Sequence, residues 1–134
     1  MENRGIRFSN RCHAILPGYQ LDFNKIASSN PREGKANVVA DKNECVEGVL
    51  YDINDTDLAR LDCFERYPDH YNRISVRVRL ADRRGVEAIT YVAQRHRTAR
   101  GLKPSKSYLN YLLAAKDILS RDYYNSLGTW ETLD

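Results

Sequence analysis

Glu65 is the residue whose type and spacing in this sequence most directly suggest proton transfer. It follows Leu58 by seven positions and Leu61 by four, so in a helix the three side chains project from one face. A carboxyl group on an apolar face is partly stripped of water, and such a group is suited to act as a general base near neutral pH. The competing interpretation is an ordinary helix-end glutamate that is solvated or ion-paired.

Other reactive side chains lack the arrangement of a known catalytic or metal site. His13, His70 and His96 are scattered, without the i, i+4 spacing of a helical metal pair, so we expect neither a metal nor another cofactor. The three cysteines lack C-x-x-C pairing and are expected to be reduced thiols. No Gly-x-Ser-x-Gly elbow is present. The nine tyrosines could donate hydrogen bonds from an apolar wall or simply pack in the core.

Basic residues give only a weak case for nucleic-acid binding. The chain has 21 basic and 18 acidic residues, a net charge of +3. Arg77 and Arg79 alternate with apolar residues, which indicates the solvated face of a strand. A basic region at residues 95–100 is the remaining candidate, and we expect no nucleic-acid partner.

Turn formers divide the first half of the chain into extended segments that must position Glu65. Residues 11–23 indicate two short strands hinged at Pro17 and Gly18, followed by a polar loop at residues 28–34. A hairpin turning at residues 41–43 is expected next. Its two strands are residues 36–40 and 45–53.

A helix of about three turns is expected from the capping residues at 54–57. It ends before Pro68, because proline disfavours helical geometry at the preceding residue. Strict alternation then predicts a second hairpin, made of residues 74–80 and 86–93.

Length, composition and element order predict the fold class. Two C-terminal helices are expected, capped by Ser105 and Ser120. A chain of 134 residues with 42% hydrophobic and 29% charged residues is typical of one folded domain, residues 1–134. Paired strands with a helix between the hairpins and helices at the C-terminus predict an α+β fold with a curved, largely antiparallel sheet or small barrel. No apolar run approaches the length of about 20 residues that crosses a bilayer, so we expect a cytoplasmic protein without a membrane partner.

Three consecutive motifs resemble the γ-glutamylcyclotransferase-like (AIG2-like) family. Residues 46–53 include that family's Gly-Val-Leu-Tyr strand. Residues 57–65 resemble its Leu-Asp-x-x-Glu helix, and His70-Tyr71 resembles the Tyr-containing strand entry that follows. The similarity extends over about residues 4–127. Its further segments are residues 17–25, 34–39, 88–92 and 103–109.

The resemblance implies both a reaction and a set of site residues. Glu65 would be the general acid/base, and Tyr71, Tyr108 and Tyr51 would bind the substrate. The implied partner is a small-molecule γ-glutamyl amine or amide, which a transferase of this family converts to 5-oxoproline and a free amine. Selectivity for the amine is expected from loops such as residues 94–103.

The family also carries an N-terminal strand that ends in a Tyr-Gly-Ser-Asn loop, whose backbone amides hold the substrate's α-carboxylate. This sequence lacks that loop, and residues 1–8 resemble the segment that follows it. A start assigned too far downstream, a truncation and a paralogue without catalysis are the three explanations. If the chain is a paralogue without catalysis, the alternative function is that of a small-molecule-binding or protein-interaction module. Loss of the strand would leave an unpaired sheet edge, through which we expect the chain to be able to form a homodimer.

Overall fold

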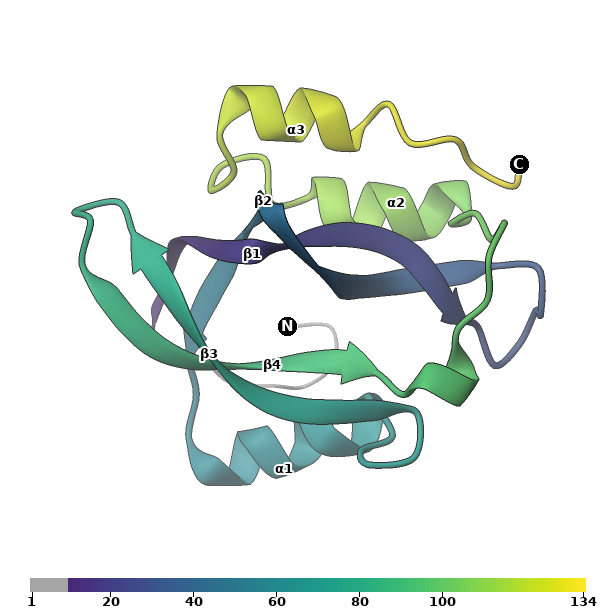
Figure 1. The fold of residues 1–134 in the computed structure, drawn as a ribbon, viewed down its shortest axis with the longest axis horizontal. Helices are drawn as coiled ribbons and strands as arrows, with labels where there is room; N and C mark the ends of the chain where they lie inside the picture. The colour runs from purple at the N-terminus through teal and green to yellow at the C-terminus, as the bar shows by residue number, and fades with distance from the viewer. Residues whose placement is uncertain (1–9) are drawn as a thin grey trace.

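The computed structural model describes residues 10–134, which form a curved four-stranded antiparallel sheet with helices packed around it (Figure 1). The strand order is β2-β1-β3-β4, so β2 and β4 are the outer strands. The strands are β1 (Asn10–Ile26), β2 (Gly34–Asp52), β3 (Tyr71–Leu80) and β4 (Gly85–Ala93). This is the α+β architecture with a curved antiparallel sheet that the element order predicts.

β1 is one continuous strand of 17 residues instead of two short ones. The predicted hinge is a local irregularity: Gly18 has a φ of +84°, and the pairing register with β2 shifts between Pro17 and Tyr19. Glycine adopts this left-handed conformation at little cost, so the strand bends without ending.

β2 corrects the predicted hairpin of residues 36–40 and 45–53, because both segments belong to one strand of 19 residues. Pro17 pairs with Cys45 and Tyr19 with Ala40, so residues 41–44 bulge out of the ladder opposite Gly18. The turn residues do act locally, and the Asn43 amide donates to Asp41 Oδ1 at 3.0 Å. β1, however, supplies a partner on both sides of the bulge, and pairing with it continues the strand.

The three α-helices begin at the caps that the sequence indicates, and the β3–β4 hairpin is also confirmed. Asn54 Oδ1 accepts from the Asp57 amide at 2.8 Å, and Ser105 and Ser120 accept from the amides three residues later. Figure 1 shows α1 beside β3 and β4, with α2 and α3 beyond β1 and β2. The helices are α1 (Asp55–Phe64), the 3₁₀ helix η2 (Arg95–Arg97), α2 (Lys106–Leu113) and α3 (Arg121–Leu127).

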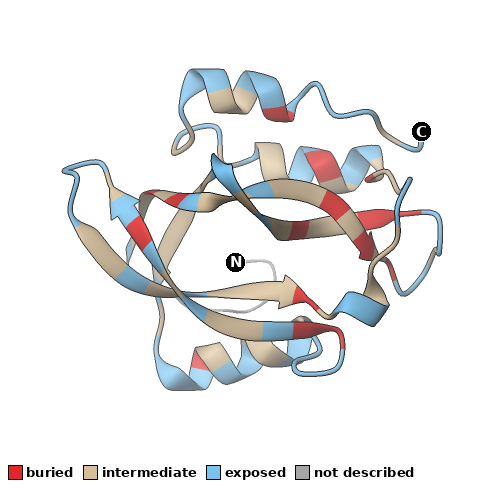
Figure 2. Cartoon of the chain, in the orientation of Figure 1, coloured by how far each residue is buried: buried red, intermediate tan, exposed pale blue. Residues whose placement is uncertain are grey.

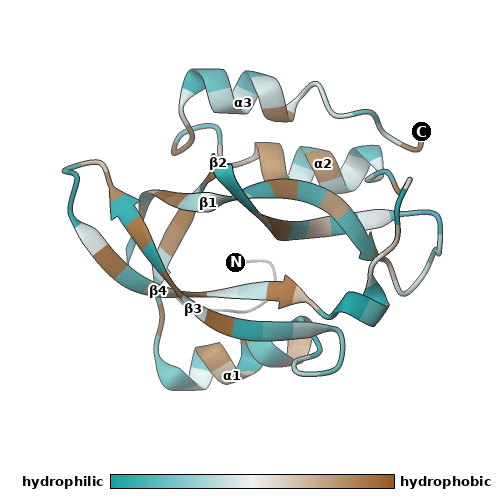
Figure 3. Cartoon of the chain, in the orientation of Figure 1, coloured by the Kyte–Doolittle hydropathy of each residue, from teal (hydrophilic) through white to brown (hydrophobic). Residues whose placement is uncertain are grey.

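Two clusters of buried side chains form the core. The first lies within the sheet and comprises Ala14, Leu16 and Val78. The second joins the sheet to the C-terminal helices, and its centre is Phe23, which is fully buried against Leu109 and Leu127. Figures 2 and 3 show that buried and apolar segments follow the strands and α2. In η2, by contrast, Arg95 and His96 are exposed and Arg97 is half-buried. The second cluster therefore fixes α2 over the end of the sheet where the candidate site lies.

Within residues 10–134, no helix combines the length and the apolar character that spanning a bilayer requires.

Candidate functional site

A cavity of about 730 Å³ lies where the end of β1 and the start of β2 meet α1 and α2. Glu65, Tyr71 and Tyr108 all line it, so three of the four site residues predicted from the sequence share one space. Lys25, Lys35, Arg66, His70 and Tyr91 line it as well. Glu65 is the one aspartate or glutamate among the described residues of the lining.

Glu65 occupies the C-cap position of α1 and is half-buried. The helix ends in a Schellman motif: the Tyr67 amide donates to Asp62 O at 2.9 Å and the Arg66 amide to Cys63 O at 3.1 Å. Arg66 has a φ of +51°, a left-handed conformation in which helices usually place glycine. The abrupt helix end thus points Glu65 into the cavity, while Leu58 and Leu61 are only half-buried.

The hydroxyl groups of Tyr71 and Tyr108 both bind the backbone of Ala36 at the start of β2. Tyr71 donates to the Ala36 carbonyl oxygen at 3.0 Å, and the Ala36 amide donates to the Tyr108 hydroxyl at 3.1 Å. Tyr71 is buried, and its ring packs edge-on against Tyr91 with centroids 6.5 Å apart. The two tyrosines therefore fix the cavity wall in addition to lining the cavity.

An ion-pair network ties the last turn of α1 to the β3–β4 hairpin. Asp62 accepts a hydrogen bond of 2.5 Å from the Tyr91 hydroxyl and pairs with Arg73 at 2.6 Å. Burial and the adjacent Asp62 carboxylate raise the pKa of Tyr91 well above its ordinary value. Tyr91 therefore stays protonated as a donor and holds the helix end that carries Glu65.

Lys25 and His70 form a buried pair that the sequence reasoning missed. Lys25 is 5% exposed and His70 is 7% exposed, and 2.9 Å separates Lys25 Nζ from His70 Nδ1. Burial lowers the pKa of His70, and the Lys25 ammonium lowers it further. His70 is thus neutral near pH 7, and Nδ1 accepts the bond from the lysine.

A signal for Lys25 was present in the sequence, but it pointed in the wrong direction. Alternation along β1 would place Lys25 on the same side as Phe23, facing the C-terminal helices. The register with β2 shifts between Asp22 and Lys25, and this irregularity turns Lys25 toward His70 instead. Lys35 is a second residue of the cavity that the sequence patterns did not indicate. Its Nζ lies 2.9 Å from Glu33 Oε2 and 4.1 Å from the centroid of the Tyr108 ring.

Tyr51 does not line the cavity that contains Glu65. It lines a neighbouring cavity of about 620 Å³ between β2 and the segment joining α2 to α3. The two cavities share part of their walls. The shared residues are Leu21, Ala36, Tyr111 and Leu112.

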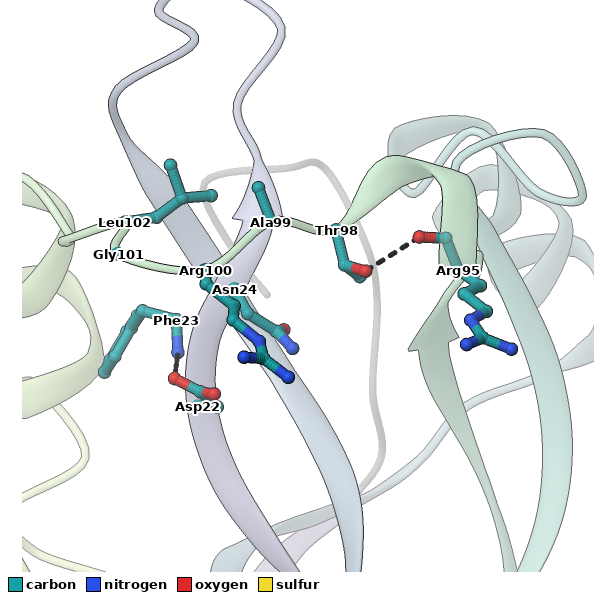
Figure 4. A pocket seen from close by; sticks show the side chains of 9 residues that line it. All are labelled: Asp22, Phe23, Asn24, Arg95, Thr98, Ala99, Arg100, Gly101 and Leu102. Carbon is teal, nitrogen blue, oxygen red and sulfur yellow. Dashed lines mark hydrogen bonds between the residues drawn. The ribbon is translucent and has the colours of Figure 1, made fainter.

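A third hollow of about 550 Å³ lies beside η2. Figure 4 shows Arg100 next to Asn24 and Asp22 of β1, with Arg95 at the far side of Thr98. Asp22 is bonded to the Phe23 amide at 2.7 Å, and Thr98 donates to Arg95 O at 2.7 Å. The predicted loop of residues 94–103 is also bonded to distant segments, since the Ala99 amide donates to Asn24 O at 2.9 Å and Lys103 O accepts from the Gly34 amide at 2.8 Å. It lies outside the cavity that contains Glu65.

The AIG2-like family model matches residues 45–127, more than half of the chain. The matched region begins within β2 and ends with α3, and it includes Glu65, Tyr71 and Tyr108. No curated protein shows significant similarity in sequence.

Solved structures share the fold. A protein described as gamma-glutamyl cyclotransferase has 23% identity and a TM-score of 0.83, with 99% of this chain and 82% of that chain covered. Uncharacterized protein loc79017 from Homo sapiens has 25% identity and a TM-score of 0.80, with coverage of 92% and 75%. YkqA from Bacillus subtilis has 20% identity and a TM-score of 0.80, with coverage of 93% of this chain and 47% of that chain.

Residues 1–8, which were compared with the family segment that follows the Tyr-Gly-Ser-Asn loop, lie outside the described residues.

Proposed function

The chain belongs to the AIG2-like family, and we propose that it is a γ-glutamylcyclotransferase-like enzyme that converts a γ-glutamyl amine or amide to 5-oxoproline and a free amine. The observation that carries this proposal is the position of Glu65. Glu65 lines a cavity of about 730 Å³ together with Tyr71 and Tyr108, within a fold shared with a gamma-glutamyl cyclotransferase.

The proposed reaction begins with proton transfer to Glu65. The carboxylate takes a proton from the α-ammonium group of the substrate, and the freed amine attacks the γ-carbonyl carbon of the same molecule. A new C–N bond closes a five-membered ring. The original C–N bond then breaks as Glu65 returns its proton to the leaving amine. The ring nitrogen gives up one of its two remaining protons, which leaves with the amine as its ammonium form, so the carboxylate ends in its starting state.

The demand on the protein is mainly one of positioning, because attacking and attacked groups belong to one molecule. The cavity is suited to this demand because its walls are fixed. Tyr71 and Tyr108 hold β2 at Ala36, and the Asp62–Tyr91 bond holds the end of α1. A bound γ-glutamyl group would thus meet Glu65 in a wall that needs little rearrangement.

The decisive experiment compares Glu65→Gln with the wild-type chain and with Glu131→Gln, a change at an exposed position of the C-terminal segment. Release of 5-oxoproline from a panel of γ-glutamyl amides is measured by chromatography, and thermal unfolding is recorded in parallel. We expect Glu65→Gln to lower kcat by about 10²–10⁴-fold with little change in stability, and Glu131→Gln to match the wild type.

Turnover by Glu65→Gln at the wild-type rate would refute the assignment of Glu65. Saturable binding of a γ-glutamyl amide by the wild-type chain, with no 5-oxoproline formed from any member of the panel, would instead favour the alternative of a binding module.

A further inference from the structure

Lys25 carries a positive charge in an almost fully buried position. Its side chain leaves β1 near the end of the strand, and the residue is 5% exposed although it lines the cavity that contains Glu65. The ammonium nitrogen lies 2.9 Å from His70 Nδ1 and 5.5 Å from the centroid of the Tyr71 ring. His70 Nδ1 accepts a hydrogen bond from the ammonium, and the Tyr71 ring attracts it through a cation–π interaction, but neither group carries a negative charge.

The surroundings leave the cavity with an excess of positive charge. Arg97, Arg66 and Lys35 act on Lys25 as like charges and, after burial itself, lower its pKa, whereas Glu65 raises it. Lys35 is already paired with Glu33 at 2.9 Å, and Arg97 is paired with Asp69 at 2.8 Å. Among the described residues of the lining, Glu65 is therefore the single acid that offsets the charges of Lys25 and Arg66.

A buried ammonium group costs free energy unless an anion approaches it. The group has three N–H donors, and His70 Nδ1 occupies one of them. Within residues 10–134, no second hydrogen-bond acceptor meets the Lys25 ammonium, so its other donors can bind a ligand that enters the cavity. The planar group that suits two donors and a positive charge is a carboxylate.

We propose that Lys25, positioned by His70, forms a carboxylate-binding subsite of this cavity. His70 holds the ammonium in place as a neutral acceptor, so it orients the charge without cancelling it. The assignment of the carboxylate to a γ-glutamyl substrate rests on the proposed function, and either the α-carboxylate or a carboxylate on the leaving amine would supply it. Binding of a carboxylate does not itself require turnover.

Calorimetric titration of Glu65→Gln with glutarate and with its neutral isostere glutaramide tests the subsite directly. In that background the Glu65 charge no longer repels the dianion. Adding Lys25→Met, an unbranched neutral side chain that ends one atom before the lysine ammonium, is expected to weaken glutarate binding at least tenfold and to leave glutaramide binding unchanged. Lys42→Met, at an exposed position in the β2 bulge, is the matched control and should leave both affinities unchanged. Equal glutarate affinity with and without Lys25→Met would overturn the proposal.

A pH series on the Glu65→Gln protein decides the question if Lys25→Met fails to fold. Lys25 faces the neutral His70 and the cations Arg97, Arg66 and Lys35, and burial together with the three cations lowers its pKa. Glu65, which raises this pKa in the wild-type chain, is uncharged in the Glu65→Gln protein. Glutarate affinity should accordingly fall as the pH rises toward the ordinary lysine value of about 10.4, before that value is reached. A constant affinity up to pH 10 would contradict a role for the ammonium group.

Three substrates identify which carboxylate is bound. They are γ-glutamylglycine, γ-glutamylglycinamide and 4-aminobutanoylglycine, of which the last lacks the α-carboxylate. If Lys25→Met lowers kcat/KM only for the two γ-glutamyl compounds, the α-carboxylate binds to Lys25. If it lowers kcat/KM only for γ-glutamylglycine and 4-aminobutanoylglycine, which share a free glycine carboxylate, the carboxylate of the leaving amine binds there. An equal loss on all three argues against the subsite. If no compound is turned over, the proposed function fails, and the glutarate titration still decides the subsite.

Discussion

Replacement of Arg66 by glycine should stabilise the protein, because Arg66 holds a backbone conformation that suits glycine. Its φ of +51° places it at the C′ position of the Schellman motif that ends α1. A left-handed conformation costs a residue with a Cβ about 1–2 kcal/mol. Glycine avoids this cost but loses roughly 0.5–1 kcal/mol more conformational entropy on folding. The net expectation is a gain of about 0.5–1 kcal/mol in the free energy of unfolding.

Arg83 provides a matched control, since its φ is +70° in the exposed turn of the β3–β4 hairpin, away from the cavity. Urea unfolding of Arg66→Gly and Arg83→Gly should show unchanged m-values. Each midpoint should rise by about 0.3–0.5 M if m is about 2 kcal/mol/M. Removal of Arg66 also takes away a like charge that acts on Lys25, so Arg66→Gly should gain at least as much as Arg83→Gly.

A fall in stability for Arg66→Gly alongside a rise for Arg83→Gly would refute this reasoning. It would mean that the Arg66 side chain makes contacts worth more than the backbone strain. Lowered m-values in both variants would instead indicate that the native state had loosened, and the strain argument would then fail at both positions.

Two further outcomes follow from the network around the cavity. Tyr91→Phe removes the 2.5 Å hydrogen bond to the Asp62 carboxylate and should lower the free energy of unfolding, measured in urea, by about 1.5–3 kcal/mol. Tyr19→Phe, a control that packs against the sheet core, should lower it by less. Equal losses in the two variants would contradict a special role for the Tyr91–Asp62 bond. The pKa of His70 lies below its ordinary value of about 6.5 because of burial and the Lys25 charge, so the unfolded chain binds the proton first. The contribution of His70 to the free energy of unfolding should therefore be complete above about pH 6.5 and be lost as the pH drops through the pKa of the folded state. The melting temperature of His70→Gln should accordingly fall less with decreasing pH than that of the wild type. An equal fall in the two proteins would exclude His70 as the source of the pH dependence.

Local signals in the sequence predict the short elements well. Asn54, Ser105 and Ser120 each cap the helix that follows, because the capping bond spans only three residues. The β3–β4 hairpin follows from strict alternation on both sides of a tight turn. In these places the physical interaction and the sequence pattern have the same short range.

The long strands are harder to predict, because a turn signal does not reveal whether a partner strand continues beyond it. Residues 41–43 have the composition of a hairpin turn, yet β1 pairs on both sides and the turn becomes a bulge. The same limit explains why Lys25 was missed: one register shift after Asp22 changes the direction in which its side chain points. Pairing over the full length of two strands is a long-range property that a window of ten residues does not contain.

The resemblance to a known family selected residues that composition alone left undecided, and the structure distinguishes among them. Tyr71 and Tyr108 are separated by 37 positions, but both bind Ala36 and both line the cavity with Glu65. Tyr51 lies in the Gly-Val-Leu-Tyr strand motif that precedes the helix, and it lines the adjacent cavity. Its role as a substrate contact stays a prediction, and it would require a substrate that extends past Tyr111 and Leu112.

The position of Glu65 at a helix end raises the question of how a proton-transfer group would be held still there. Three sets of bonds answer it. The Schellman motif fixes the backbone on either side of Glu65, Asp62 anchors the preceding turn to Tyr91, and the His70 amide donates to Arg66 O at 2.8 Å. The last bond connects the segment after Glu65 to the residue that positions Lys25. The proposed base and the proposed carboxylate subsite are therefore joined through one short segment, residues 65–70. A change that loosens this segment should impair proton transfer and carboxylate binding together, whereas Lys25→Met and Glu65→Gln should separate them.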